Sequence, residues 1–153
     1  MQDGIVAALV DLQTALTSLH ESVGLLDLLP DLAHLVHETA RSHGIGAAIE
    51  NVGSVEYIPP AVGAELLAVT ETALSNVVEH SRATNVVVTI AADVSGAWLR
   101  IADDGCGIGD APQGKGMKDM ACRAARLDGT CTWRHNEPTG TVVDFQVPLR
   151  HGG

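Results

Sequence analysis

Residues 103–109 read Asp-Asp-Gly-Cys-Gly-Ile-Gly, a loop rich in glycine and aspartate that is the first candidate binding motif. Glycines at alternate positions let the backbone adopt positive φ angles and approach a flat ligand closely. Asp103 follows an apolar run, and at the end of a strand its carboxylate can accept a hydrogen bond from an exocyclic amine such as that of adenine. A plain turn is the alternative. A calcium-binding EF-hand is excluded because its acidic ladder and its twelfth-position glutamate are missing.

A second glycine pair follows in residues 114–117, Gly-Lys-Gly-Met, which we expect to open a helix. The unpaired N–H groups and the positive dipole end of a helix N-terminus suit phosphate groups. Four cations fall within residues 115–126 of a chain whose net charge is −10. This group indicates a specific anion site, with a solvated helix face as the alternative. The spacing fits neither a Walker A loop nor a full G-x-G-x-x-G motif.

A polar stripe runs along the helix expected over residues 61–81. Thr72, Asn76 and His80 are spaced four apart, opposite the Leu/Val face. An Asn amide oxygen is a suitable ligand for Mg²⁺ that bridges substrate phosphates, although for the stripe taken alone a solvated helix face is the favoured interpretation. His34, His37 and Glu38 lack an H-E-x-x-H order and a third ligand, so we interpret them as surface residues.

The elements around these motifs follow from hydrophobic periodicity. A seven-residue apolar repeat over residues 5–26 predicts a coiled-coil or bundle helix. The remaining predictions are helices over 31–43, 61–81 and 115–127, an extended stretch over 45–58 that is split at 51–54, and strands over 85–93, 97–102, 130–135 and 140–148. Helices come first and mainly antiparallel strands follow, which predicts an α+β two-layer sandwich.

Composition excludes several classes of protein. Hydrophobic residues make up 46% of the 153 residues and charged residues 18%, so wholesale disorder is excluded. The acidic balance argues against a nucleic-acid or anionic-membrane partner. No apolar run approaches the length of a membrane span, and no signal peptide is visible, so we expect a cytoplasmic protein. Three cysteines without a C-x-x-C pair argue against a disulfide or zinc framework.

The order of these motifs resembles the GHKL (Bergerat-fold) ATPases, and within them the catalytic ATP-binding domain of sensor histidine kinases of the NarX/DesK-like nitrate- and oxygen-sensor branch. Residues 71–81 match the N box, 103–109 the G1 box and 114–120 the G2 box, and the closing Gly140-Thr141 also fits. The resemblance implies a two-layer Bergerat sandwich with a mixed, mainly antiparallel sheet and three helices. The expected division is residues 1–27 as the end of a dimerisation helix and 28–150 as the ATP-binding domain.

The resemblance also implies roles for individual residues. Asn76 would hold Mg²⁺, Asp103 would recognise adenine with Thr141 behind it, and residues 108–113 would form a short lid. The residues expected to act in catalysis are Asn76, His80 and Lys115. Those expected to contact ATP are Asn76, His80, Ser81, Asp103, Gly105, Gly107, Ile108, Gly114, Lys115, Gly116, Met117 and Thr141.

Two positions depart from the branch. Thr72 stands where a Glu is usual, and Glu79 stands where a cation is usual. Glu71 cannot replace that Glu, because on an ideal helix it lies about 140° from Asn76. These departures leave the strength of ATP turnover open.

The resemblance implies an enzyme that transfers the γ-phosphate of ATP to a histidine. That histidine would lie on the dimerisation domain of the same kinase, usually in a homodimer, and a response regulator would follow. Between Glu21 and Ile45 the chain has no room for a second hairpin helix, so His20 is not the expected acceptor and the chain alone should be inactive. An anti-sigma-type serine kinase and a non-catalytic nucleotide-sensing module are the alternatives.

Overall fold

The computed structural model describes residues 28–106 and 115–149. The predicted heptad helix at 5–26 lies outside the described residues, and so do Gly107, Ile108 and Gly114. For His80 and Lys115 the backbone is described but the side chains are not. In chain order the elements are α2 (Leu28–Ser42), β1 (Gly46–Gly53), η1 (Val55–Tyr57), α3 (Pro60–Asn76), η2 (Val77–Ser81), β2 (Asn85–Ala92), β3 (Gly96–Asp103), α4 (Lys115–Arg126), β4 (Thr130–His135) and β5 (Thr141–Pro148).

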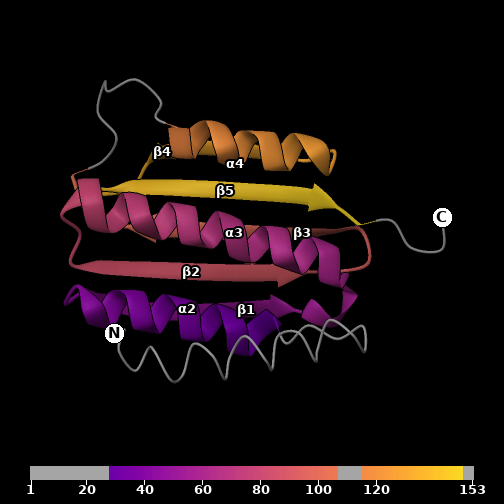
Figure 1. The fold of residues 1–153 in the computed structure, drawn as a ribbon, viewed down its shortest axis with the longest axis horizontal. Helices are drawn as coiled ribbons and strands as arrows, with labels where there is room; N and C mark the ends of the chain where they lie inside the picture. The colour runs from indigo at the N-terminus through magenta and orange to yellow at the C-terminus, as the bar shows by residue number, and fades with distance from the viewer. Residues whose placement is uncertain (1–27, 107–114, 150–153) are drawn as a thin grey trace.

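These elements form two layers (Figure 1). Within the described residues, one sheet has the strand order β1-β2-β3-β5-β4, and the helices α2, α3 and α4 cover one of its faces. β1 pairs with β2 in parallel, while β2–β3, β3–β5 and β4–β5 pair antiparallel. The predicted α+β sandwich with a mixed, mainly antiparallel sheet is confirmed.

The core lies between the sheet and the helices. Alternate residues of the central strands point toward the helices and are buried, since side chains alternate between the faces of a strand. The helices contribute apolar residues at helical spacing, such as Leu32 and Val36 of α2 and Leu66 and Val69 of α3. Pro60–Glu79 has the length and composition of a membrane-spanning helix, yet its apolar residues form part of this core.

One prediction about the extended stretch is wrong. The strand β1 continues through the expected break as far as Gly53, and Val55–Tyr57 forms a 3₁₀ turn instead of a second extended piece. The reason is pairing. The parallel ladder with β2 ends at Gly53 opposite Ala92, where Gly53 has a φ of 85° and the Ser54 amide donates to the Ala92 carbonyl. The chain must then leave the sheet to reach the start of α3.

The direction of α3 positions the site. Because α3 connects two parallel strands, it must run back across the sheet, and its last residue, Asn76, lies at the edge where β2 begins. The antiparallel strand β3 ends at this same edge with Asp103. α4 starts here as well, next to the end of α3 (Figure 1). Three segments far apart in the sequence therefore meet at one edge of the sheet.

Candidate functional site

Asp103 is the buried carboxylate of this edge. It ends β3, and only 5% of its surface is exposed. The Gly105 amide donates to its Oδ1 at 2.8 Å, and the backbone of Thr141 also hydrogen-bonds to the carboxylate. Burial raises the pKa of Asp103 and outweighs these two hydrogen bonds, which lower it. A carboxylate offers about four acceptor positions, so this one retains capacity for a further donor.

The loop after Asp103 packs against the end of the long helix. The Cys106 amide donates to the Ser81 carbonyl oxygen at 2.7 Å. A Cβ atom at position 105 would overlap the same carbonyl oxygen, so only glycine permits this approach. The predicted G1 loop and the end of the predicted N box are therefore in direct backbone contact.

A π-helical turn, Val77–Ser81, follows Asn76 and shapes that contact. π turns inside helices are rare and are often found at functional sites. The Ser81 hydroxyl donates to the Val77 carbonyl at 2.8 Å, and Ser81 is 6% exposed. The side chain of Ser81 is thus turned back into the helix, and its backbone carbonyl is the group that contacts the loop.

The start of α4 lies beside the polar stripe of α3. A Cβ atom at Gly116 would meet the Thr72 methyl carbon at 3.0 Å and both side-chain amide atoms of Asn76 at 3.6 Å. Thr72 and Asn76 are half-buried, whereas Glu71 and Glu79 are exposed. Thr72 therefore occupies the side of the helix that faces the site, and Glu71 does not. The absence of a side chain at Gly116 lets the start of α4 approach Thr72 and the Asn76 amide closely.

The remaining predicted residues either lie near the edge where α3, β3 and α4 meet or fall outside the part of the chain that the structure describes. Met117 is half-buried against the core, and Thr141 is 8% exposed at the start of β5. Gly140 has a φ of 113°, and a Cβ atom there would overlap the Asp103 carbonyl oxygen. Of the predicted set, the structure brings together Asn76, Ser81, Asp103, Gly105, Gly116, Met117 and Thr141, whereas Gly107, Ile108, Gly114 and the side chains of His80 and Lys115 are not described.

Sequence reasoning missed the role of Asp104. Its carboxylate accepts hydrogen bonds from the amide and hydroxyl of Thr84 at 2.8 and 2.7 Å, and from the amide and side chain of Asn85 at 2.9 and 3.2 Å. Led by the Thr84 hydroxyl, these bonds hold the pKa of Asp104 well below its usual range. The available signal was the pair of adjacent aspartates together with a Thr-Asn pair at the start of the neighbouring strand.

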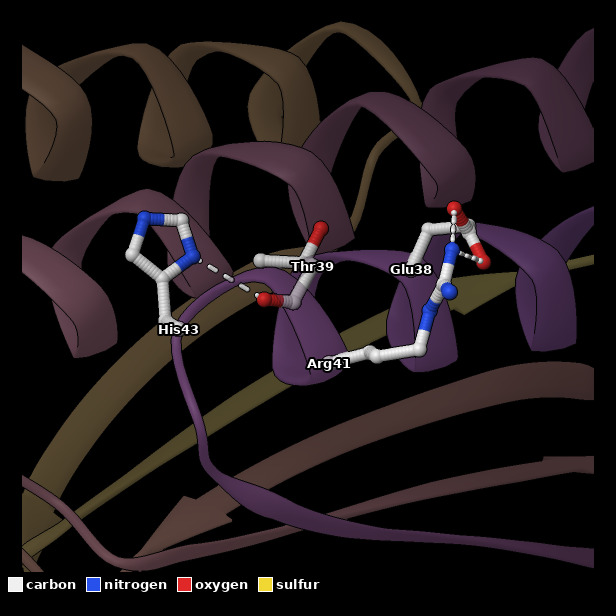
Figure 2. Close-up of polar contacts among 4 residues, drawn as sticks. All are labelled: Glu38, Thr39, Arg41 and His43. Carbon is white, nitrogen blue, oxygen red and sulfur yellow. Dashed lines mark hydrogen bonds and ion pairs between the residues drawn. The ribbon is translucent and has the colours of Figure 1, made fainter. Parts of the chain in front are cut away.

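Figure 2 shows polar contacts at the end of α2, the helix that carries His34, His37 and Glu38. The Arg41 guanidinium donates to both Glu38 oxygens at 2.7 and 2.9 Å, and His43 Nδ1 lies 3.0 Å from the Thr39 carbonyl oxygen. No cluster of three metal-binding side chains occurs within residues 28–106 and 115–149. His34 and His37 are exposed and Glu38 pairs with Arg41, so the interpretation of the two histidines as surface residues is confirmed.

Comparisons with known proteins identify the family. The family model of the histidine kinase-, DNA gyrase B-, and HSP90-like ATPases matches residues 62–151. The sensor histidine kinase YxjM of Bacillus subtilis is 29% identical over 79% of this chain, and the nitrate/nitrite sensor protein NarX of Escherichia coli K12 is 32% identical over 76%. The chain spans 30% of the length of the first relative and 20% of the second.

Solved structures share the fold at low sequence identity. The ATP-binding domain of PrrB from Mycobacterium tuberculosis matches with a TM-score of 0.64 and 19% identity, covering 82% of this chain and 96% of that one. The histidine kinase domain from the blue-light activated kinase of Erythrobacter litoralis matches with a TM-score of 0.61 and 17% identity, covering 82% and 63%. The chain therefore belongs to the family of histidine kinase-, DNA gyrase B-, and HSP90-like ATPases.

Proposed function

We propose that this chain is the ATP·Mg²⁺-binding catalytic domain of a cytoplasmic sensor histidine kinase, and that it transfers the γ-phosphate to a histidine on a separate dimerisation domain. The observation that carries the proposal is the buried Asp103 carboxylate, held by two backbone groups at the edge where α3, β3 and α4 meet. Family membership and the likeness to YxjM and NarX support the reaction type.

Adenine is the base that this carboxylate fits. The ionised Asp103 can only accept hydrogen bonds, and the 6-amino group of adenine is a donor. Guanine presents a carbonyl at the same position, which would leave the buried carboxylate unpaired. Thr141, whose backbone bonds to the carboxylate, would fix its orientation.

The phosphate side of the site fits a magnesium ion. The Asn76 amide is half-buried and lies against Gly116, at the N-terminus of α4. Amide oxygen is a hard ligand that suits Mg²⁺, and the helix N-terminus suits the phosphates. A bound Mg²⁺ would supply charge neutralisation to the triphosphate. Asn76 would hold the ion, and His80 and Lys115 would contribute from the same two helices.

The chain's own residues would act mainly by positioning. The reactive nitrogen of the acceptor histidine already carries a lone pair, so it attacks the γ-phosphorus without a base on this chain. The bond from phosphorus to the bridging oxygen breaks, and ADP leaves with the electron pair. Thr72 cannot ionise near neutral pH, so water would be a poor substitute nucleophile. A homodimer and a response regulator would complete the system.

The test is incubation with radiolabelled ATP. The chain alone should stay unlabelled and hydrolyse little ATP, and a supplied histidine-bearing dimerisation domain should become labelled. An acid-labile product identifies phosphohistidine, whereas an acid-stable product would point to serine transfer. Strong labelling of the chain alone at His20 would contradict the division at residues 27 and 28.

A nucleotide-sensing module without transfer is the second candidate. The observation that favours it is Thr72, which stands beside Asn76 and faces the start of α4 without an ionisable group. Glu79, exposed one turn further on, adds a negative charge near the proposed phosphate region. ATP binding without labelling of any supplied dimerisation domain would select this candidate.

A further inference from the structure

The adenine-facing carboxylate is the last residue of its strand, where a sheet usually frays. Asp103 pairs with Val86 as the last step of the antiparallel ladder, and the Asp104 amide adds one more hydrogen bond to the Asn85 carbonyl at 3.2 Å. Beyond these two residues the chain leaves the sheet. A carboxylate that must meet a base in one orientation therefore depends on whatever holds this strand end.

Asp104 holds the strand end from outside the core. Asp103 is buried, like its ladder partner Val86, whereas Asp104 follows the last residue of the strand and is exposed. The Asp104 carboxylate accepts four hydrogen bonds, all from Thr84 and Asn85 at the start of β2. Two of the donors are backbone amides, so the bonds tie the strand end to the neighbouring main chain and not only to mobile side chains.

The turn between β4 and β5 holds the same two residues by their carbonyl groups. The Asn136 side-chain amide donates to the Asp103 carbonyl at 2.9 Å, and the Thr139 hydroxyl donates to the Asp104 carbonyl at 3.2 Å. Gly140 packs against the Asp103 carbonyl oxygen without room for a side chain. The backbone next to the Asp103 side chain is thus held by the β4–β5 turn and by β2. Among these contacts, the hydrogen bonds of the Asp104 carboxylate are the ones that involve a charged group.

We propose that Asp104 is a positioning residue for base recognition: by clamping the end of β3 to the start of β2, it sets the orientation in which Asp103 meets the 6-amino group of the nucleotide. This inference rests on the proposed function. It assigns to Asp104 a role in selectivity between bases, exerted without contact with the nucleotide.

The decisive readout is the ratio of ATP to GTP affinity in the presence of Mg²⁺, measured by calorimetry on the full chain. Loss of charged hydrogen bonds in Asp104→Ala should lower this ratio about tenfold. Asp104→Asn should retain most of it. The Asn oxygen can still accept from both backbone amides, and its NH₂ group can donate to the Thr84 hydroxyl, which is also an acceptor.

Asp93→Ala is the matched control. Asp93 also accepts backbone and side-chain hydrogen bonds, from Ser95 and Gly96, but at the opposite end of the same two strands. The Asp93→Ala variant should have a lower melting temperature and an unchanged ratio of ATP to GTP affinity. Thr84→Val removes one donor and keeps the backbone amide, so it should lower the ratio by a smaller factor than Asp104→Ala even if the latter does not fold.

The outcomes separate the two proposals. An unchanged ratio in Asp104→Ala or, if that variant does not fold, in Thr84→Val overturns the positioning role. A fall in the melting temperature with no change in the ratio, as in the control, makes Asp104 structural only. A wild-type chain that binds no ATP, or binds ATP and GTP equally, overturns the adenine assignment of Asp103 itself. If Asp103→Ala removes the preference for ATP over GTP and Asp104→Ala does not, the proposed function is supported and the positioning role of Asp104 is overturned.

Discussion

The two ends of the β2–β3 hairpin use the same kind of restraint for different purposes. At the turn, the Asp93 carboxylate accepts from the amide and hydroxyl of Ser95 and from the Gly96 amide, and its pKa is lowered chiefly by the Ser95 hydroxyl. At the open end, Asp104 is held in the same way. Only the open end carries a buried acid, Asp103, whose pKa is raised. A carboxylate that accepts hydrogen bonds from nearby backbone amides therefore fixes the chain at both ends of the hairpin. What distinguishes the open end is the buried carboxylate of Asp103, which lies next to the restraining Asp104.

The largest expected effect of a substitution at the open end of the hairpin and the adjoining end of α3 is loss of phosphotransfer. We expect Asn76→Ala to abolish phosphotransfer to a supplied dimerisation domain, because the amide oxygen would be the metal ligand, while the fold stays intact. Ser75→Ala, exposed on the same turn of α3, is the control. Transfer assays and thermal melts measure both. A variant that melts much earlier, or that transfers normally, would make Asn76 structural.

A smaller effect is expected from a substitution that removes base recognition. Asp103→Ala should weaken ATP binding by about 1–3 kcal/mol, the usual cost of leaving a polar group without its buried partner. GTP binding should change little, because guanine offers no amine at that position. Calorimetry with both nucleotides checks this. Equal affinities in the unmodified chain would remove the adenine assignment and, with it, the contrast between the two hairpin ends.

Adding a methyl group at the start of α4 should separate nucleotide binding from stability. In Gly116→Ala the added methyl group would press on Thr72 and lie against the Asn76 amide. The gain in helix propensity, up to about 1 kcal/mol, offsets part of the cost of the close contact with Thr72, so the melting temperature should change little. ATP·Mg²⁺ affinity should fall several-fold, while exposed Lys118→Ala on the same helix should change it less. Unchanged affinity would place the phosphates elsewhere.

The neighbouring aspartates should respond to pH with opposite signs. Burial raises the folded pKa of Asp103 above its ordinary value of about 3.9, so its contribution to stability declines as the pH rises from about 3.9 through the raised pKa. The folded pKa of Asp104 is lowered, so its contribution is present above about 3.9 and is lost as the pH falls toward the folded pKa.

Two variants measure these contributions. Urea unfolding between pH 3 and 7 should show Asp103→Asn gaining on the unmodified chain as the pH rises, because no charge is then buried. Asp104→Asn should lose less stability on acidification than the unmodified chain does. Asp93→Asn should behave like Asp104→Asn, since its pKa is lowered as well. Parallel curves for all the chains would contradict the assigned directions.

Much of the fold could be predicted from the sequence because its periodicities are unambiguous. The alternation in residues 85–92 and the apolar spacing of residues 60–76 gave β2 and α3 within a few residues. The extended stretch after Gly53 was misjudged because Val55 and Tyr57 have high strand propensity, whereas the sheet pairing that ends at Ala92 decides the local structure.

The site was predicted in its parts but not in its contacts. Short motifs identified Asp103, Asn76 and Gly116 as candidates, yet their roles as ligands stay predictions. The adjacent aspartates and the Thr-Asn pair were a signal, but they did not show that Asp104 would bind residues 84 and 85, about twenty positions earlier, and nothing indicated that a π turn would follow Asn76. Such features depend on tertiary pairing, which a single sequence does not display.

The separation between Asp104 and its partners has a consequence for folding kinetics. The Asp93 turn closes across two residues, while Asp104 must find partners about twenty residues away. Short loops close first, so we expect the hairpin to form from its turn and to pair its open end, with Asp103 and Asp104, late. Substitutions at Asp93 should therefore slow folding, and substitutions at Asp104 should mainly speed unfolding. A nucleotide bound at the proposed site would then act chiefly on the unfolding rate, because contacts that form late in folding are absent from the transition state.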